Sequence, residues 1–312
     1  MLSRRNLRIK VMQALYIVEH DSTYEKARLN QFLKSSIRAY YHAYLHSLYY
    51  LIHTAEFSIT DAQIQAGKHI NKNENISVRI FHNPIIQNLV LDKSLQADFN
   101  KLQFDLKADQ DHFRRFYGEL KKSEEYQTFL NSDESDLKET KKILIYLFKE
   151  IIFKQEVFVG HMEEFFNNWE DDCDLVNMTM HQTIDKFKPT VKSAVVKISE
   201  DFKEEDEFCL DLLEQTLVHH EELNDFITPR LKNWELDRVA TVDIIVMRMA
   251  LTEWLFFPSI PVKVTINEYI DIAKRYSTPK SGDFVNGILD NILKDLREKN
   301  LVQKKGRGLI EF

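Results

Sequence analysis

Apolar residues recur at intervals of three and four along most of the chain, which is the spacing of one face of an α-helix. The pattern is clearest in residues 3–20, 205–220 and 236–257 and in the stretch after Pro279. The turns that β-rich folds need are built mostly from Gly and Pro, and the 312 residues hold only 7 and 6 of them. The pattern therefore predicts an all-α protein.

The middle of the chain, residues 21–203, is helical in pattern but carries no recognisable motif. We predict helices over 24–57, 109–130, 137–158 and 173–187, and a polar loop over 67–83. Further on, Thr265 and Glu268 have the spacing of a capping box, which predicts a helix start at Thr265. Gly287 inside the last helix predicts the close approach of another backbone.

Charge is unevenly spread along a chain whose net charge is −7. This balance argues against a generally basic surface for nucleic acid, but it permits a local basic patch. Arg4, Arg5 and Arg8 lie in the first turns of a predicted helix, where the helix dipole disfavours cations. We interpret them as facing an anion. Guanidinium groups on one face suit the phosphates of single-stranded RNA, whose bases are free to stack on aromatic rings.

The sequence shows none of the residue groupings that a catalytic, metal or cofactor site would need. Cys173 and Cys209 form no spaced motif, which favours a reduced, cytoplasmic protein. No segment approaches the roughly 20 apolar residues of a membrane span. No metal-ligand cluster, nucleophile with a base, or glycine-rich phosphate loop is evident. The sequence therefore predicts a binding protein without cofactor, metal or catalytic site.

Four motifs carry a resemblance to a known family: residues 11–16 (VMQALY), 260–268 (IPVKVTINE), 273–275 (AKR) and 284–290 (FVNGILD). Over residues 1–20 and 204–298 the chain resembles the NusB family of transcription antitermination factors. The resemblance implies a helical bundle of two packed subdomains, formed by 1–20 and 204–303. Residues 21–203 would be an inserted helical region packed on or appended to the bundle, and 304–312 a loose tail.

The family has no catalytic activity and binds RNA. The resemblance implies binding to boxA-like single-stranded RNA of ribosomal RNA leaders, jointly with the small-subunit ribosomal protein NusE. The complex would join the RNA polymerase elongation complex through other Nus factors. The RNA-binding positions of the family map onto Arg4, Arg5, Arg8, Lys280 and Phe284.

Two further positions map onto the family's NusE-facing surface, Tyr16 and Asp243. One arginine position of the family's N-terminal motif is Asn6 here, which removes part of the charge.

Two other interpretations stay open. The chain could be a helical scaffold that binds only protein, through its insertion. It could also be related to the N-terminal bundle of a ribosomal RNA cytosine methyltransferase. The latter predicts a downstream cofactor-binding sheet and cysteine motifs, which are not found in this sequence.

Overall fold

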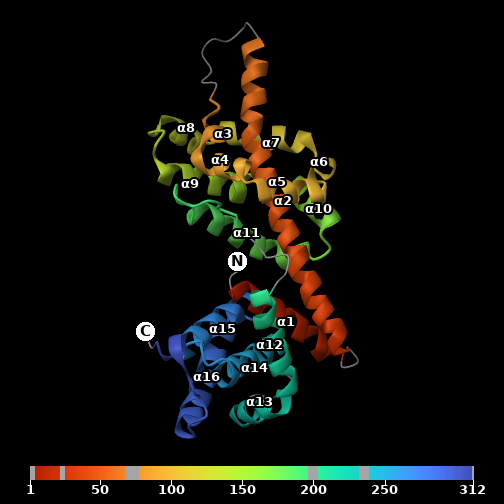
Figure 1. The fold of residues 1–312 in the computed structure, drawn as a ribbon, viewed down its shortest axis with the longest axis vertical. Coiled ribbons are helices and arrows are strands. Elements are labelled where there is room, and N and C mark those ends of the chain that lie inside the picture. The colour runs from red at the N-terminus through yellow and green to blue at the C-terminus, as the bar shows by residue number, and fades with distance from the viewer. Residues whose placement is uncertain (1–3, 22–24, 68–76, 196–202, 232–238, 311–312) are drawn as a thin grey trace. The chain divides into compact units, whose positions relative to one another are not determined.

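The computed structural model describes residues 4–21, 25–67, 77–195, 203–231 and 239–310. All regular secondary structure in these ranges is helical, so the prediction of an all-α fold is confirmed. The chain divides into two compact units, which Figure 1 shows in colours that follow the sequence. We call Met1–Ile37 with Ile198–Phe312 the terminal unit, and Arg38–Lys197 the central unit. Among the described residues, no helix is both long enough and apolar enough to span a membrane.

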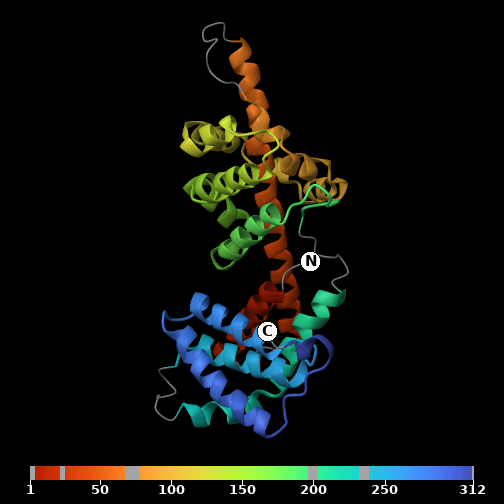
Figure 2. The ribbon, with the colours of Figure 1, turned by 90° about the vertical axis from the view of Figure 1, so that its left-hand side faces the viewer.

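The terminal unit is a bundle built around one buried helix, α14, which packs against α1, α12, α13, α15 and α16 (Figure 2). Every residue from 245 to 254 of α14 is buried, including Arg248 and Glu253. The helices of this unit are α1 (Arg4–His20), α12 (Lys203–Val218), α13 (His220–Ile227), α14 (Thr241–Phe256), α15 (Val262–Tyr276) and α16 (Ser281–Glu298), with 3₁₀ turns at Thr228–Arg230 and Gly306–Leu309.

A single long helix, α2 (Lys26–Gly67), begins in the terminal unit and continues into the central unit. The other helices of the central unit are α3 (Arg79–His82), α4 (Pro84–Leu91), α5 (Lys93–Leu102), α6 (Phe104–Lys107), α7 (Gln110–Lys122), α8 (Glu124–Asn131), α9 (Leu137–Tyr146), α10 (Glu156–Phe165) and α11 (Trp169–Asp185). A π-helical turn at Leu147–Ile152 continues α9.

Some predicted helices are divided in the structure. The helix predicted over 109–130 is two helices, because Ser123 ends α7 and its hydroxyl accepts a hydrogen bond from the amide of Tyr126 at the start of α8. The helix predicted over 137–158 ends after the π-helical turn, and α10 begins anew at Glu156. The predicted loop at 67–83 falls partly outside the described residues, and α3 already begins at Arg79.

Two predictions about individual residues in the terminal unit are wrong. Thr265 lies inside α15 rather than at its start, and its hydroxyl bonds to Glu253 instead of capping the helix. Gly287 is exposed, and a Cβ placed there would meet no atom within 4 Å, so no backbone passes close by.

Of the segment 304–312, predicted to be a loose tail, the described residues 304–310 are held against the end of α14. The Lys304 amine donates to the backbone oxygens of Glu253 and Phe257, at 2.9 and 3.0 Å, and the amide of Lys305 donates to Pro258. Gly308 is buried, and a Cβ there would lie 2.0 Å from the Pro258 oxygen. A residue without a side chain is therefore required at this approach.

Candidate nucleic-acid interface

The arginines predicted to bind RNA differ sharply in exposure. Arg4 is exposed at the first residue of α1, and its guanidinium carbon lies 5.1 Å from the centre of the Phe208 ring. No carboxylate among the described residues pairs with Arg4. The Arg5 side chain is 36% exposed, and its guanidinium donates to both carboxylate oxygens of Glu268 at 2.9 Å and to Asp271 at 3.0 Å. The hydrogen bond to Glu268 raises the pKa of Arg5.

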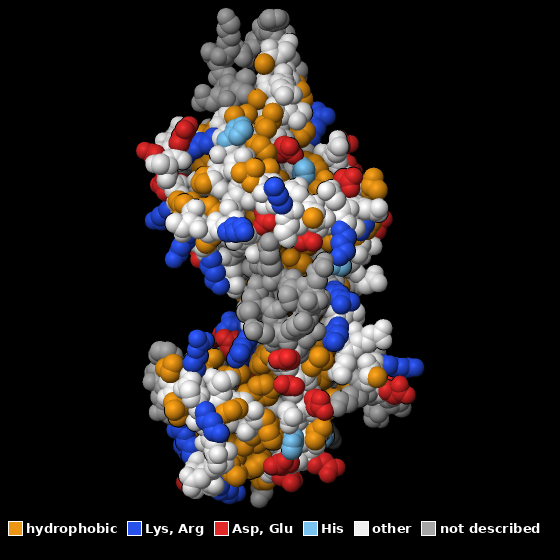
Figure 3. Space-filling view, viewed as in Figure 1, with side chains coloured by type: hydrophobic (Ala, Val, Ile, Leu, Met, Phe, Trp, Pro, Cys, Tyr) orange, Lys and Arg blue, Asp and Glu red, His pale blue; other side chains and the backbone are white. Residues whose placement is uncertain are grey.

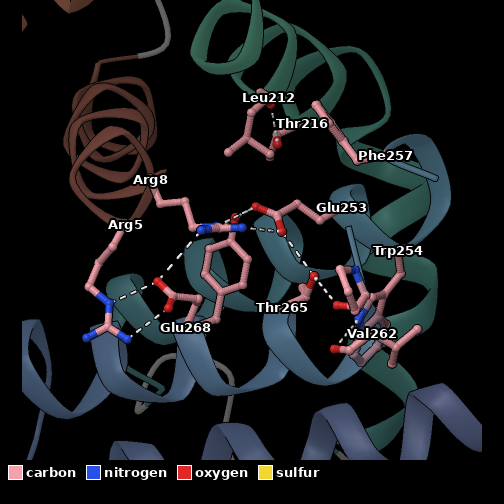
Figure 4. A network of polar contacts seen from close by, with 12 residues as sticks. Arg5, Arg8, Leu212, Thr216, Glu253, Trp254, Phe257, Val262, Thr265 and Glu268 are labelled. Atoms are coloured by element: carbon pink, nitrogen blue, oxygen red, sulfur yellow. Dashed lines mark hydrogen bonds and ion pairs between the residues drawn. The ribbon is translucent and has the colours of Figure 1, made fainter. Parts of the chain in front are cut away.

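Arg8 is not on the same surface, because its side chain is only 3% exposed. Its Nε and terminal nitrogen donate to the two oxygens of Glu253, at 2.6 and 2.9 Å (Figure 4). Burial alone would lower the pKa of Arg8, but the charge and hydrogen bonds of Glu253 more than offset it and raise the pKa. The anion that faces this arginine is therefore a carboxylate of the chain itself.

Glu253 is the centre of a network that joins three helices. Its fully buried carboxylate also accepts hydrogen bonds from Thr265 at 3.0 Å and from Tyr269 at 2.8 Å, both on α15. An ion pair removed from water is stable only when its remaining hydrogen-bonding positions are also filled, which these donors do. The network fixes the start of α1 to α14 and α15, and thereby positions Arg4 and Arg5 one turn earlier.

Asn6 stands where the family's N-terminal motif has an arginine, and the structure shows where this position lies. Asn6 is buried, so the arginine missing from the motif falls at an interior position and not on the exposed side of α1. The exposed charge of this segment is carried by Arg4 and Arg5.

Lys280 and Phe284 lie together at the start of α16, and Asp243 lies beside them in the first turn of α14. All three line one cavity of about 190 Å³, whose other walls are Val239, Ala240, Thr278 and Ser281. Lys280 is exposed, the Phe284 ring is half-buried, and Asp243 is only 4% exposed. The structure thus brings together residues that the family resemblance assigns to different partners.

Tyr16 is 43% exposed on α1, and the centre of its ring lies 4.2 Å from that of His20. A larger groove of about 390 Å³ lies on the same helix, lined by Leu15 and Val18 together with residues of α12, α13 and α14. One wall of the groove is polar, because Arg248 pairs with Glu19. Tyr16 is therefore accessible to a partner, whereas Asp243 is reached only through its cavity.

The two signs of charge occupy different helices of the terminal unit. On the face drawn in Figure 3, acidic side chains gather over α12 and α13, and Lys and Arg side chains over α15 and α16. The acidic partners of the arginines, Glu253, Glu268 and Asp271, were not among the predicted site residues. One signal was available in the sequence: Glu253 interrupts an apolar helix face, and a carboxylate there requires a cation or a set of donors.

In the described part of the chain, no three His, Cys, Asp or Glu side chains are grouped so that they could hold a metal ion. The arrangement offers cations, a carboxylate in a cavity and an aromatic wall, which are groups for binding.

Comparisons with known proteins agree with the motifs. The model of the NusB family matches residues 173–294. The chain is 48% identical over 104 residues to the transcription antitermination protein NusB of Salinibacter ruber, covering 33% of this chain and 65% of that protein. It is 41% identical over 112 residues to the protein of the same name from Chloroherpeton thalassium, covering 36% and 53%. It is 46% identical over 92 residues to that of Geobacter sulfurreducens, covering 30% and 67%.

The matched part of the chain thus spans between about half and two thirds of these relatives. No solved structure matches the chain.

Proposed function

This chain belongs to the NusB family, and we propose that it acts in transcription antitermination by binding boxA-like single-stranded RNA together with the ribosomal protein NusE. The proteins it resembles over this region carry the name of that activity. In this proposal the complex joins the RNA polymerase elongation complex through other Nus factors, and the chain contributes binding rather than catalysis.

The observation that carries the proposal is the pair of accessible guanidinium groups at the start of α1. Arg4 is exposed, Arg5 is about one-third exposed, and the buried pair of Arg8 with Glu253 holds their helix to the bundle. Phosphates bind guanidinium groups through paired, charge-assisted hydrogen bonds. A site that is already positioned loses little conformational entropy when RNA binds.

Tyr16 supports the protein-binding half of the proposal. An exposed tyrosine on a rigid helix provides a large contact area at a low entropic cost, and tyrosine is enriched at protein interfaces. In this proposal NusE contacts α1 at Tyr16, on the same helix that presents Arg4 and Arg5 to RNA.

The proposal is tested by measuring the affinity of the full chain for a boxA-like RNA by fluorescence anisotropy over a range of salt concentrations. We expect Arg4→Ala with Arg5→Ala to weaken binding and to make the log–log salt slope shallower by about 0.7 for each phosphate that the variant no longer neutralises. The melting temperature should change little, because Arg5 makes only partly exposed ion pairs. Unchanged affinity and slope would show that this helix is not the RNA surface.

Three further variants make the test specific. Lys294→Ala with Lys299→Ala removes the same charge from exposed positions on and just after α16, and should leave the affinity nearly unchanged. Asp271→Asn frees Arg5 from one carboxylate and should tighten RNA binding. Repeating the titrations with NusE separates the partners, since a Tyr16→Ala variant should bind RNA alone normally but show no further increase in affinity when NusE is added. Binding of NusE that is insensitive to salt, without any RNA binding, would favour the protein-only scaffold.

A further inference from the structure

Basic and aromatic side chains meet on one side of α2 in the central unit. Arg38, His42 and His46 follow one another at intervals of four residues, so they form a row along this helix. Exposure decreases along the row, because Arg38 is exposed, His42 is partly buried and His46 is fully buried. The Phe104 ring of α6 packs against His46, with the ring centres 4.4 Å apart. The row therefore leads from the surface to the contact between α2 and α6.

Lys107, at the end of α6, adds a second cation to this side of α2. Its amine lies 5.8 Å from the centre of the Phe104 ring and 5.9 Å from that of Phe165, the last residue of α10. An ammonium group is attracted to the electron-rich face of an aromatic ring. Phe165 is 38% exposed, whereas its ring neighbours His46 and His161 are buried. An accessible ring is thus held beside an amine.

His42 reports the electrostatic character of this side of α2. Burial lowers the pKa of its imidazole, and the positive charges of Lys107, Arg38 and Lys101 lower it further. Cations of three helices, α6, α2 and α5, therefore lie close enough to act on one side chain. The repulsion within such a group of like charges is relieved when an anion binds. We call this set the basic face: Arg38, His42, Lys101, Lys107 and Phe165.

The carboxylates on the same helices are directed to other sides. Burial and the charge of Asp105 raise the pKa of Tyr49, so this acid of α6 acts on a later turn of α2. Glu163 and Glu164 precede Phe165 on α10, but at about 100° per residue they are turned roughly 200° and 100° away from it around the helix. The basic face therefore keeps its positive charge beside the exposed ring.

We propose that the basic face of the central unit is a second RNA-binding site, which takes single-stranded RNA regardless of its sequence. This inference rests on the proposed function, because it adds a contact for the same class of ligand. The cations bind phosphates and the Phe165 ring stacks on a base, which is the combination found in sites for single strands. Paired bases of a duplex are not free to stack on the ring. An acidic peptide would pair with the cations but leave the ring without a stacking partner.

The test uses the full chain carrying Arg4→Ala and Arg5→Ala, which removes the proposed RNA contacts of the terminal unit, and a short oligouridine followed by fluorescence anisotropy. This protein should still bind the RNA. Adding Lys101→Ala with Lys107→Ala should weaken binding and make the log–log salt slope shallower by about 0.7 for each phosphate that is no longer neutralised.

A change in the ring separates stacking from charge. Phe165→Leu keeps an apolar side chain but removes the aromatic surface. It should weaken binding of oligouridine about tenfold and leave the salt slope unchanged, because the ring carries no charge. Lys138→Ala with Lys188→Ala removes the same charge as the lysine variant from exposed positions elsewhere in the central unit, and should change neither the affinity nor the slope.

His42 supplies a readout inside the site. Phosphates placed among the cations offset their charge, so RNA should raise the pKa of His42 in an NMR titration of the full chain. The His42 signal is identified by its absence from the spectrum of His42→Gln. An unchanged pKa in the presence of saturating RNA contradicts the site.

The outcomes distinguish this inference from the proposed function. If the protein with Arg4→Ala and Arg5→Ala binds no oligouridine, or if the basic-face variants bind it like their parent, the second site is overturned. The proposed function still stands in that case when the wild type binds boxA-like RNA through Arg4 and Arg5. Failure of the wild type to bind any RNA overturns both. Competition by polyglutamate as strong as that by oligouridine, with no effect of Phe165→Leu, would assign the basic face to an acidic protein segment.

Discussion

The two units bury polar groups in different ways. In the core of the terminal unit, the ion pair of Arg8 with Glu253 is surrounded by donors. In the central unit, three buried side-chain contacts join neutral groups: Tyr40 bonds to Thr179, Tyr44 to Thr183 at 2.7 Å, and His46 to His161 at 2.8 Å. A buried ion pair is tolerated only with its full set of partners, whereas neutral pairs are individually weak and can be repeated.

The difference follows from what each set of contacts positions. The two Tyr–Thr pairs lie one turn apart on α2 and one turn apart on α11, so together they fix one register between those helices. The ion pair of the terminal unit fixes one point, the start of α1. That point is next to Arg4 and Arg5. The buried ion pair therefore lies where the proposed RNA surface must be held in place.

The largest expected effect on stability comes from breaking the ionic network around Glu253. Glu253→Ala leaves the Arg8 guanidinium buried without its partner, which should lower the free energy of unfolding by about 3–5 kcal/mol. The measurement is denaturant unfolding of the full chain followed by circular dichroism. Arg8→Met combined with Glu253→Leu removes both charges and should restore most of that stability. A Glu253→Ala protein as stable as the wild type would show that the pair contributes nothing to the fold.

A smaller effect concerns pH and the central unit. Burial lowers the pKa of His161 from 6.5 to about 4, and that of His46 well below 6.5. Between about pH 4 and 6.5 the unfolded chain therefore binds protons that the folded chain does not, so these groups make stability fall as the pH falls through this window. The contribution is fully present above pH 6.5.

Unfolding at several pH values tests this expectation. Because carboxylates also titrate on acidification, the informative quantity is the difference between wild type and His161→Gln. The variant should lose less stability than the wild type between pH 6.5 and pH 4. His82→Gln, at an exposed position of the same unit, serves as the control and should follow the wild type. Parallel curves for wild type and His161→Gln would rule out this role for the histidine pair.

The sequence predicted the helices well and the partners of the charged residues poorly. Periodicity reports which face of a helix is buried, so the all-α class and the apolar face of α14 could be predicted. It does not report which residues meet across distant segments. The anion expected to face the arginines of α1 was RNA, whereas Arg8 and Arg5 pair with Glu253 and Glu268, which are 245 and 263 residues away along the chain. For the same reason, periodicity could not predict that Asp243 lines one cavity together with Lys280 and Phe284.

The finest comparison between the units uses one isosteric substitution in each. Thr265 and Thr183 are both buried, both lie inside helices, and both hydroxyls also contact a backbone oxygen one turn earlier. Thr265→Val removes a donor from a buried carboxylate and should cost about 1.5–3 kcal/mol, whereas Thr183→Val removes a neutral partner of Tyr44 and should cost about 1 kcal/mol. Because side-chain volume and burial are matched, the difference between the two destabilisations reports the charge of the partner. Equal destabilisation in denaturant unfolding would mean that the ionic network of the terminal unit is no more demanding than the neutral pairs of the central unit.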